Sequence, residues 1–183
     1  MTLDNQLLTL IQNEREFTEV FSILAKMHLK NAYLCAGALR DYVWCTKENL
    51  DFHLITRNLD IYYCDPNESY EEYLTRKTEL NQRHSKYLWE LTNISLKNPK
   101  FPATTELDTV LKNFPETCSA VGLTYTENGF EVVAPYGLAD LFSETIQPTS
   151  AYLEKNSPSA FKQRVMRKKW LTHYPHTTLK LPE

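Results

Sequence analysis

The strongest fold signal in the sequence is the stretch NAYLCAGALRDYVW, at residues 31–44. Its first part, residues 31–36, is a short apolar run that stops at Gly37, a pattern typical of a buried strand followed by a tight turn. Residues 38–44 have apolar positions at helical spacing and contain no helix breaker. The stretch therefore predicts a strand, a glycine turn and a helix.

On both sides of this stretch, helix and strand patterns alternate. Helical spacing predicts two helical pieces in residues 1–30, with Asp4 as the N-cap of the first, and further helices at 68–84, from a capping box at 105–108, at 138–144 and at 158–173. Strand-like runs lie at 59–64, 87–95, 118–125 and 129–134, the last two joined by the hairpin signal Asn128-Gly129, while residues 45–57 are expected to form a loop. We therefore expect an α/β (α+β) domain with a mixed sheet flanked by helices, a helical N-terminus and a C-terminal helix.

Length and composition favour one globular domain over residues 1–183. We divide it into N-terminal helices (1–30), a mixed-sheet core (31–145) and a C-terminal loop and helix (146–183). The 42% apolar and 23% charged residues argue against disorder, and no apolar run is long enough to span a bilayer. The first residues lack the pattern of a secretory signal, so we expect a cytoplasmic protein without membrane contact.

Charge, glycine content and cysteine spacing exclude several function classes. The formal net charge of −3 gives no strong overall attraction to nucleic acid. Four glycines cannot supply a Walker loop or a G-x-G-x-x-G fingerprint. The four cysteines are widely spaced without a C-x-x-C pair, so we expect buried reduced thiols rather than a zinc site.

Two oxygen-donor side chains follow the glycine turn on the next strand. Asn58 and Asp60 stand at i and i+2, which places both side chains on one face of a strand, toward whatever lies over the Gly37 turn. Such a pair suits a hard cation such as magnesium, which takes few carboxylates together with phosphate oxygens. From the spacing alone, polar residues that face solvent at a strand end are favoured over a metal site.

Six short segments carry a family resemblance, and they occur in the same order as in that family. They are GALRDYVW at 37–44, NLDIYYCD at 58–65, WELTN at 89–93, SAVG at 119–122, APYGLADLF at 134–142 and RVMRKKW at 164–170. The first two resemble the strand-turn-helix and D-x-D segments of the DNA polymerase beta-like nucleotidyltransferase superfamily, and GALRD is similar to the G-G-x-V-R-D of CCA-adding enzyme head domains. The whole set resembles a family of small, stand-alone bacterial nucleotidyltransferase-like proteins.

This resemblance implies transfer of a nucleoside monophosphate from an NTP to an acceptor, with Mg²⁺ or Mn²⁺ held by carboxylates. By position in the motifs, Asn58 and Asp60 would be metal ligands, and Asp60 and Glu90 the catalytic carboxylates. The nucleotide would be bound by residues of the glycine turn and of the last helix, namely Gly37, Ala38, Arg40, Arg164 and Lys168. The acceptor stays open, as a small molecule, a protein or an RNA end.

Several alternatives remain open at this stage. Asn58 stands where the family has the first Asp of its D-x-D pair, so the chain is alternatively a catalytically degenerate module that binds nucleotide or another protein. Asp140 fits an early-helix residue better than a catalytic base. The basic cluster of Arg164, Arg167, Lys168 and Lys169 fits either a solvated helix face or a contact with polyphosphate or RNA. The tryptophans Trp44, Trp89 and Trp170 are expected in the core rather than as base-stacking platforms.

Overall fold

The computed structural model describes residues 1–29 and 31–182, and its centre is a five-stranded mixed sheet. The strands are β1 (Tyr33–Cys35), β2 (Asn58–Tyr63), β3 (Leu88–Asn93), β4 (Gly122–Thr126) and β5 (Gly129–Val133), in the spatial order β3-β2-β1-β4-β5. β2 and β3 are parallel, and the other neighbouring pairs are antiparallel. The short strands β6 (Thr145–Ile146) and β7 (Thr178–Leu179) form a separate parallel pair.

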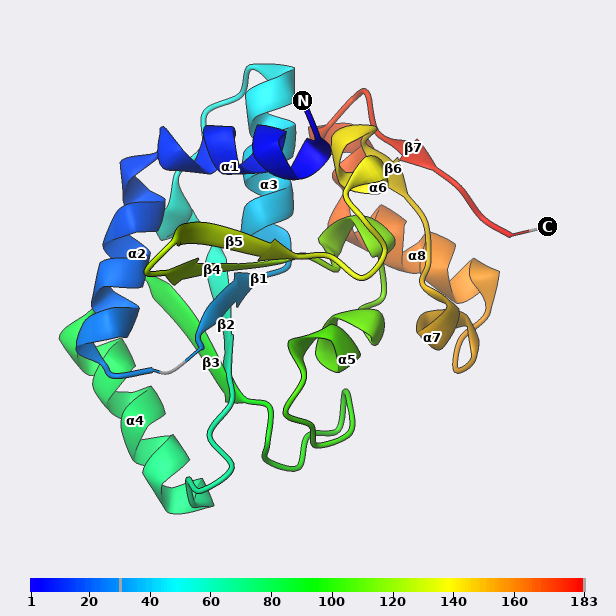
Figure 1. The fold of residues 1–183 in the computed structure, drawn as a ribbon. Coiled ribbons are helices and arrows are strands. Elements are labelled where there is room, and N and C mark those ends of the chain that lie inside the picture. Colours follow the sequence, from blue (N-terminus) through cyan, green and yellow to red (C-terminus); the bar gives the residue numbers. More distant parts are fainter. Residues whose placement is uncertain (30, 183) are drawn as a thin grey trace.

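Helices cover both faces of this sheet. They are α1 (Leu3–Gln12), α2 (Arg15–Lys26), α3 (Gly37–Glu48), α4 (Tyr70–Arg83), α5 (Leu107–Lys112), α6 (Ala139–Phe142), α7 (Ser150–Leu153), α8 (Pro158–Lys168) and α9 (Trp170–His173). Figure 1 shows α2 and α4 on one side of the sheet, and α5, α7 and α8 on the other. The expected class, a mixed sheet flanked by helices, is confirmed.

Strand alternation separates the two faces chemically. Leu59 and Ile61 of β2 are fully buried in the large core that includes α1, α2 and α3. Asp60 and Tyr62 alternate with them and point to the opposite face, where Tyr62 packs in a smaller cluster with α5. The face that carries Asp60 is therefore the face covered by α5.

Several element boundaries differ from the sequence predictions. The N-cap of α1 is Thr2, whose side chain accepts a hydrogen bond from the Asn5 amide, so the prediction of Asp4 was wrong. The helix α3 continues to Glu48, into a segment expected to be a loop, and α5 begins at Leu107 without a side-chain cap. The predicted last helix is interrupted at Lys169, which has a φ of 55°.

Three of the four cysteines are buried, as the sequence analysis predicted. All four cysteines are free thiols, of which Cys35, Cys45 and Cys118 are buried and Cys64 is half-buried. In residues 1–29 and 31–182, none of the helices combines the length and the apolar character that crossing a bilayer requires.

Candidate functional site

A cavity of about 670 Å³ lies on the α5 side of the sheet. Its lining comes from the β1–α3 turn, from β2, from the loops on both sides of α5, and from α7, α8 and α9. Among the predicted site residues, the cavity brings together Gly37, Arg40, Asp60, Arg164 and Lys168. Three predicted site residues, Ala38, Asn58 and Glu90, are not part of the lining.

The β1–α3 turn presents the start of a helix to the cavity. Ala36 has a φ of 64° and a ψ of −131°, a backbone conformation that L-residues rarely adopt, and its carbonyl accepts the Arg40 amide of the first helical turn. A Cβ added to Gly37 would meet only Arg40 Nη2, at 3.6 Å, so glycine leaves open space above the turn. The N–H groups of a first helical turn lack partners within the helix and favour anions. Ala38 is buried one position further on, below the cavity surface.

Asp60 is a half-buried carboxylate in the wall of the cavity. Among the described residues, no side chain or backbone group forms a hydrogen bond or an ion pair with it. Burial, together with the Glu90 carboxylate on the neighbouring strand, raises the pKa of Asp60 from 3.8 to about 6, although Lys100, Lys168 and Arg40 oppose this shift. The Asp60 carboxylate can therefore accept a ligand from the cavity without breaking a contact with a described residue.

The other two predicted carboxylate-motif residues face solvent. Glu90 lies opposite Asp60 in the parallel β2–β3 register, but its side chain is 56% exposed and its Oε2 lies 3.7 Å from Lys77 Nζ on α4. Asn58 is exposed at the first position of β2, two residues before Asp60 on the same face. The sequence pattern predicted Asn58 and Asp60 on one strand face, and the resemblance added Glu90 from the next strand; of these three residues, only Asp60 lines the cavity.

This donor set fits one divalent cation better than two. Within the described parts of the chain, no group of three or more His, Cys, Asp or Glu side chains is arranged to hold a metal ion. Mg²⁺ commonly binds through one or two carboxylates, several waters and substrate phosphates. The unpartnered Asp60 carboxylate can supply one such ligand, with the Asn58 amide oxygen on the same strand face as a neutral second.

Arg40 is held firmly in the cavity wall. Its Nε and Nη2 donate to Asp41 Oδ1 at 3.1 and 2.7 Å, and its Nη1 donates to Ser119 Oγ at 2.8 Å. The guanidinium also lies between the rings of Trp44 and Trp170, at 5.2 and 4.3 Å from their centroids. Arg40 thus contributes a fixed positive charge, and most of its donors are already used.

Arg164 and Lys168 both line the cavity from α8, but only Arg164 is paired with a carboxylate of the described structure. Arg164 Nε and Nη2 lie 2.8 and 2.7 Å from Oε1 of the buried Glu116. The Arg164 charge is therefore neutralised by an ion pair within the protein. Lys168, one turn later, is exposed and forms no salt bridge with any described residue. Lys168 is therefore the α8 cation that is available to a ligand.

The cavity also contains residues that the sequence did not indicate. Lys100 comes from the loop after β3, and Lys155 from the turn between α7 and α8. Like Lys168, both are exposed and have no carboxylate within salt-bridge distance in the described structure. Aromatic side chains cover another part of the lining, namely Tyr62, Phe101, Phe114, Tyr152 and Trp170. The cavity therefore combines free ammonium groups with flat apolar surface.

Three further motif residues, Asp140, Arg167 and Lys169, lie outside the cavity lining. Asp140 lies in the first turn of α6, and its Oδ2 accepts hydrogen bonds from Thr117 Oγ1 at 2.5 Å and from Gln147 Nε2 at 2.6 Å. These contacts fit the prediction of an early-helix residue better than that of a catalytic base. Of the basic cluster, Arg167 and Lys169 are exposed and are not part of the lining. The three tryptophans are buried, as predicted, although Trp170 also lines the cavity.

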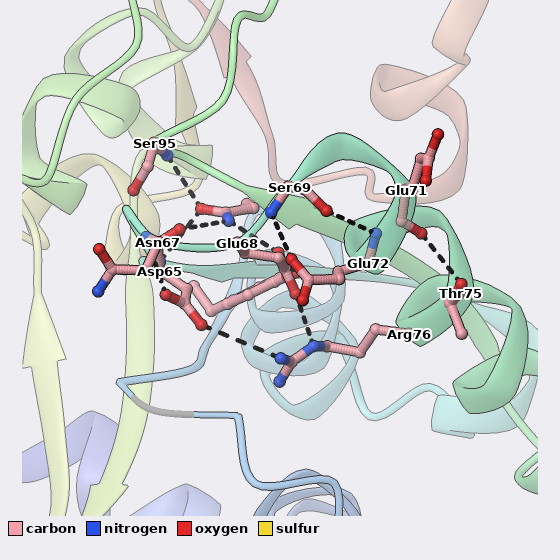
Figure 2. Close-up of polar contacts among 11 residues, drawn as sticks. Asp65, Asn67, Glu68, Ser69, Glu71, Glu72, Thr75, Arg76 and Ser95 are labelled. Carbon is pink, nitrogen blue, oxygen red and sulfur yellow. Dashed lines mark hydrogen bonds and ion pairs between the residues drawn. The ribbon is translucent and has the colours of Figure 1, made fainter.

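A separate polar cluster joins the end of β2 to α4 (Figure 2). Glu68 is buried there and pairs with Arg76 Nε at 2.7 Å, and it also accepts hydrogen bonds from Asn93 and Tyr63. Asn93 donates to the Asp65 carbonyl and accepts the Asp65 amide. The WELTN motif thus contributes an anchor for the loop after β2 through Asn93.

Solved structures with this architecture include nucleotidyltransferases. A protein whose NMR structure reveals a CCA-adding enzyme head domain is 26% identical to this chain over 97% of this chain and 96% of that one, with a TM-score of 0.82. The CCA-adding enzyme of Bacillus stearothermophilus in complex with CTP is 17% identical, with a TM-score of 0.59 over 91% of this chain and 41% of that one. A tRNA nucleotidyltransferase complexed with a primer tRNA and an incoming ATP analog is also 17% identical, with a TM-score of 0.51 over 88% and 46%.

The chain spans less than half the length of the last two enzymes, and at 17% identity these likenesses establish the fold alone. No curated protein sequence matches the chain. A family model described as nucleotidyltransferase matches residues 22–179, which include every residue of the cavity. The chain therefore belongs to this nucleotidyltransferase family.

Proposed function

We propose that this protein transfers a nucleoside monophosphate from an NTP to an acceptor, with Mg²⁺ or Mn²⁺. The observation that carries the proposal is the composition of the main cavity, where the unpartnered Asp60 carboxylate faces the free ammonium groups of Lys100, Lys155 and Lys168 beside the start of α3. A nucleotide presents the complementary chemistry, because it joins a strongly anionic triphosphate to a flat apolar base.

In this proposal, each part of the cavity has a distinct task. The lysines and the first turn of α3 bind and orient the phosphates, and Arg40 adds a fixed positive charge behind them. Asp60, with Asn58 as a neutral neighbour, would hold the divalent cation, which supplies charge neutralisation between the phosphates and the carboxylate. The aromatic side chains around Tyr62 and Phe114 exclude water and pack against the base.

The proposed acceptor is a small molecule, a protein or an RNA end. The compared enzymes are described with CTP, an ATP analog and a primer tRNA, which supports an NTP as the proposed substrate and an RNA end as one candidate acceptor. A net charge of −3 favours a small molecule, a protein or a short RNA end over a long nucleic acid. A cytoplasmic location and a single domain over residues 1–183 remain part of the proposal.

A second function is favoured by the carboxylate geometry. Glu90 is exposed and paired with Lys77, and Asn58 is neutral. The cavity carboxylates Asp41 and Glu116 are paired with arginines, so among the described residues of the lining only Asp60 offers an unpaired carboxylate to a cation. A catalytically degenerate member would use the same lysines and aromatic residues to bind a nucleotide without transferring it, or would bind another protein.

Calorimetric titration with each NTP, with and without Mg²⁺, and an assay for pyrophosphate release separate the two functions. The proposed transferase binds an NTP more tightly with Mg²⁺ and releases pyrophosphate when acceptor candidates are added. The variant Lys100→Gln should weaken NTP binding, whereas the matched change Lys26→Gln, on the remote end of α2, should leave it unchanged. Absence of NTP binding in the wild-type protein refutes both nucleotide functions.

Two substitutions at the carboxylate positions refine this test. Asp60→Asn should abolish the Mg²⁺ dependence of NTP binding and the release of pyrophosphate, because Asp60 is the one carboxylate of the described lining that is not paired with an arginine, unlike Asp41 and Glu116. Asn58→Asp should increase the Mg²⁺ affinity, since it adds a second carboxylate on the same strand face. NTP binding that persists without any Mg²⁺ effect in all three proteins would favour the degenerate module.

A further inference from the structure

Tyr62 of β2 has a hydroxyl group without a partner in the described part of the chain. The side chain is 8% exposed and lines the main cavity. Every other buried tyrosine of the described residues has its hydroxyl within hydrogen-bond reach of a protein atom, namely Tyr42, Tyr63, Tyr87 and Tyr174. Within residues 1–29 and 31–182, Tyr62 has no such contact. Buried polar groups are nearly always paired, so this hydroxyl indicates a partner from outside the chain.

The Tyr62 hydroxyl opens to the cavity and is not sealed in its wall. It is not one of the described polar side-chain atoms that lack both a partner and contact with solvent. The ring packs against Phe101 and Phe114, whose centroids lie 6.1 and 6.0 Å from that of Tyr62. Burial, together with the nearby Asp60 carboxylate, raises the pKa of Tyr62, so the hydroxyl stays a neutral hydrogen-bond donor. The cavity therefore presents one uncharged donor beside two phenyl rings.

The strand register places Tyr62 beyond the residues that would bind the phosphates and the cation. In the antiparallel β1–β2 pair, Cys35 lies opposite Asp60, and Tyr33 lies opposite Tyr62. Because the glycine turn follows Cys35, Tyr62 is two residues, or about 6.6 Å, further from the turn than Asp60 is. Residues at i and i+2 of a strand share one face. On the cavity face, the order is therefore glycine turn, Asp60, Tyr62.

A nucleotide carries its groups in the same order. The ribose follows the phosphates, and the base follows the ribose. A ribose hydroxyl is neutral and can both accept and donate a hydrogen bond, so it matches an uncharged donor. The phosphates, in contrast, are attracted to the ammonium groups and to the start of α3. The phenyl rings beside Tyr62 are then available to the base.

We propose that the Tyr62 hydroxyl donates a hydrogen bond to a ribose hydroxyl of the bound NTP, and that Tyr62 thereby selects ribonucleotides over deoxynucleotides. This inference rests on the proposed nucleotide function and adds a specificity-determining residue to it. A deoxy sugar that lacks the accepting hydroxyl leaves the Tyr62 donor unpaired in the occupied cavity, which weakens binding.

Calorimetric titration of the protein in Mg²⁺ with ATP, CTP, GTP and UTP, and with the 2′-deoxy and 3′-deoxy forms of each, tests this selection. For the NTP that binds most tightly, we expect one deoxy form to bind about three- to tenfold more weakly, the range for one neutral hydrogen bond. The position of the missing hydroxyl identifies the partner of Tyr62. Equal affinities for this NTP and both of its deoxy forms overturn the proposal.

Tyr62→Phe tests the residue, since it keeps the ring and removes only the hydroxyl. The variant should bind the NTP about three- to tenfold more weakly and the deoxy form as tightly as the wild type does, so the ribose preference disappears. Tyr136→Phe is the matched control, because the Tyr136 hydroxyl bonds the Lys112 carbonyl outside the cavity lining, and it should leave the preference unchanged. A ribose preference that persists in Tyr62→Phe overturns the proposal.

Thermal unfolding without ligand tests whether the Tyr62 hydroxyl is unpaired in the protein. Tyr62→Phe should not lower the midpoint, whereas Tyr63→Phe should, because it removes the hydrogen bond to the buried Glu68. A comparable fall in both variants would mean that the Tyr62 hydroxyl has a protein partner, and it would overturn the proposal.

The titrations also keep the role of Tyr62 apart from nucleotide transfer. NTP binding and pyrophosphate release without a ribose preference that depends on Tyr62 would overturn this role alone. Absence of NTP binding would overturn both the role of Tyr62 and the proposed function.

Discussion

The guanidinium of Arg40, on α3, lies 4.3 Å from the ring centroid of Trp170, on α9. The same guanidinium forms two hydrogen bonds with Asp41 and one with Ser119, at the centre of the molecule. This cation–π contact joins α3, the helix that follows the glycine turn, to α9, and both residues line the main cavity.

Arg40→Lys should destabilise the protein by about 2–4 kcal/mol, although it conserves the charge. A lysine ammonium cannot bond Asp41 and Ser119 together while lying flat against Trp170, so buried polar groups lose their partners. Urea unfolding measures the change. The matched substitution Arg15→Lys, at an exposed position of α2, should change the free energy of unfolding by less than about 0.5 kcal/mol. Equal effects of the two substitutions would contradict the role of Arg40.

Asp60→Asn should stabilise the protein at pH 8 but not at pH 4. Because burial raises the pKa of Asp60 from 3.8 to about 6, the folded state binds a proton more tightly than the unfolded state. The stability that depends on this proton is complete below about pH 4 and is lost as the pH rises through 6. The variant lacks this loss, so at pH 8 it should exceed the wild type by roughly 1–3 kcal/mol.

Urea unfolding at pH 4, 6 and 8, in the presence of a chelator, measures this pH dependence. Asp51→Asn serves as the control, because Asp51 is an exposed carboxylate and should show no comparable gap. A constant difference between Asp60→Asn and wild type at all three pH values would show that Asp60 does not titrate in this range.

Ala36→Gly should raise the free energy of unfolding by about 1 kcal/mol. Ala36 has a φ of 64° and a ψ of −131°, a region in which glycine avoids the steric cost of a Cβ. Thermal unfolding should show a higher midpoint for this variant and a lower one for Ala25→Gly, an exposed position within α2. A rise in the midpoint for Ala36→Gly together with a fall for Ala25→Gly would support strain at Ala36, since a general effect of added glycine would lower both midpoints.

Arg164→Met should cost about 3–5 kcal/mol, because it leaves the Glu116 carboxylate buried without its counter-charge. The double variant Arg164→Met/Glu116→Gln should recover part of this loss, since the remaining side chain is neutral. A double-mutant cycle by chemical unfolding gives the coupling energy between the two residues. Strictly additive effects would mean that the ion pair does not stabilise the fold.

Local patterns were sufficient to predict most of the fold. The apolar run before Gly37, the alternation around Ile61 and the Asn128-Gly129 hairpin signal each depend on neighbouring residues, and all three elements are present. The interruption at Lys169 was not predictable in this way, because lysine is a good helix former and its positive φ results from the packing of Trp170 and Tyr174 into the core.

Site residues were predictable only where they belong to a recognisable sequence motif. Gly37, Asp60 and Lys168 belong to such motifs, and the fold brings them to one cavity. Lys100 and Lys155 lie in loops that show no hydrophobic periodicity, and only tertiary packing brings them into the lining of the cavity that contains Asp60. The solvent exposure of Glu90 was missed for a related reason. The alternation of side chains along a strand shows which face a residue lies on, but not whether that face borders a cavity or solvent, and β3 is the edge strand of the sheet.

The order in which the main cavity is completed follows from the path of the chain. Its lining begins at Ala36 and extends to Trp170, and the α8–α9 wall is the last part to be added. During translation, at about 5–20 residues per second, a nascent chain can form the whole five-stranded sheet while Arg164, Lys168 and Trp170 are still inside the ribosome. In the nascent chain, the cavity therefore lacks one wall, and it is complete only after the segment with Trp170 has left the exit tunnel.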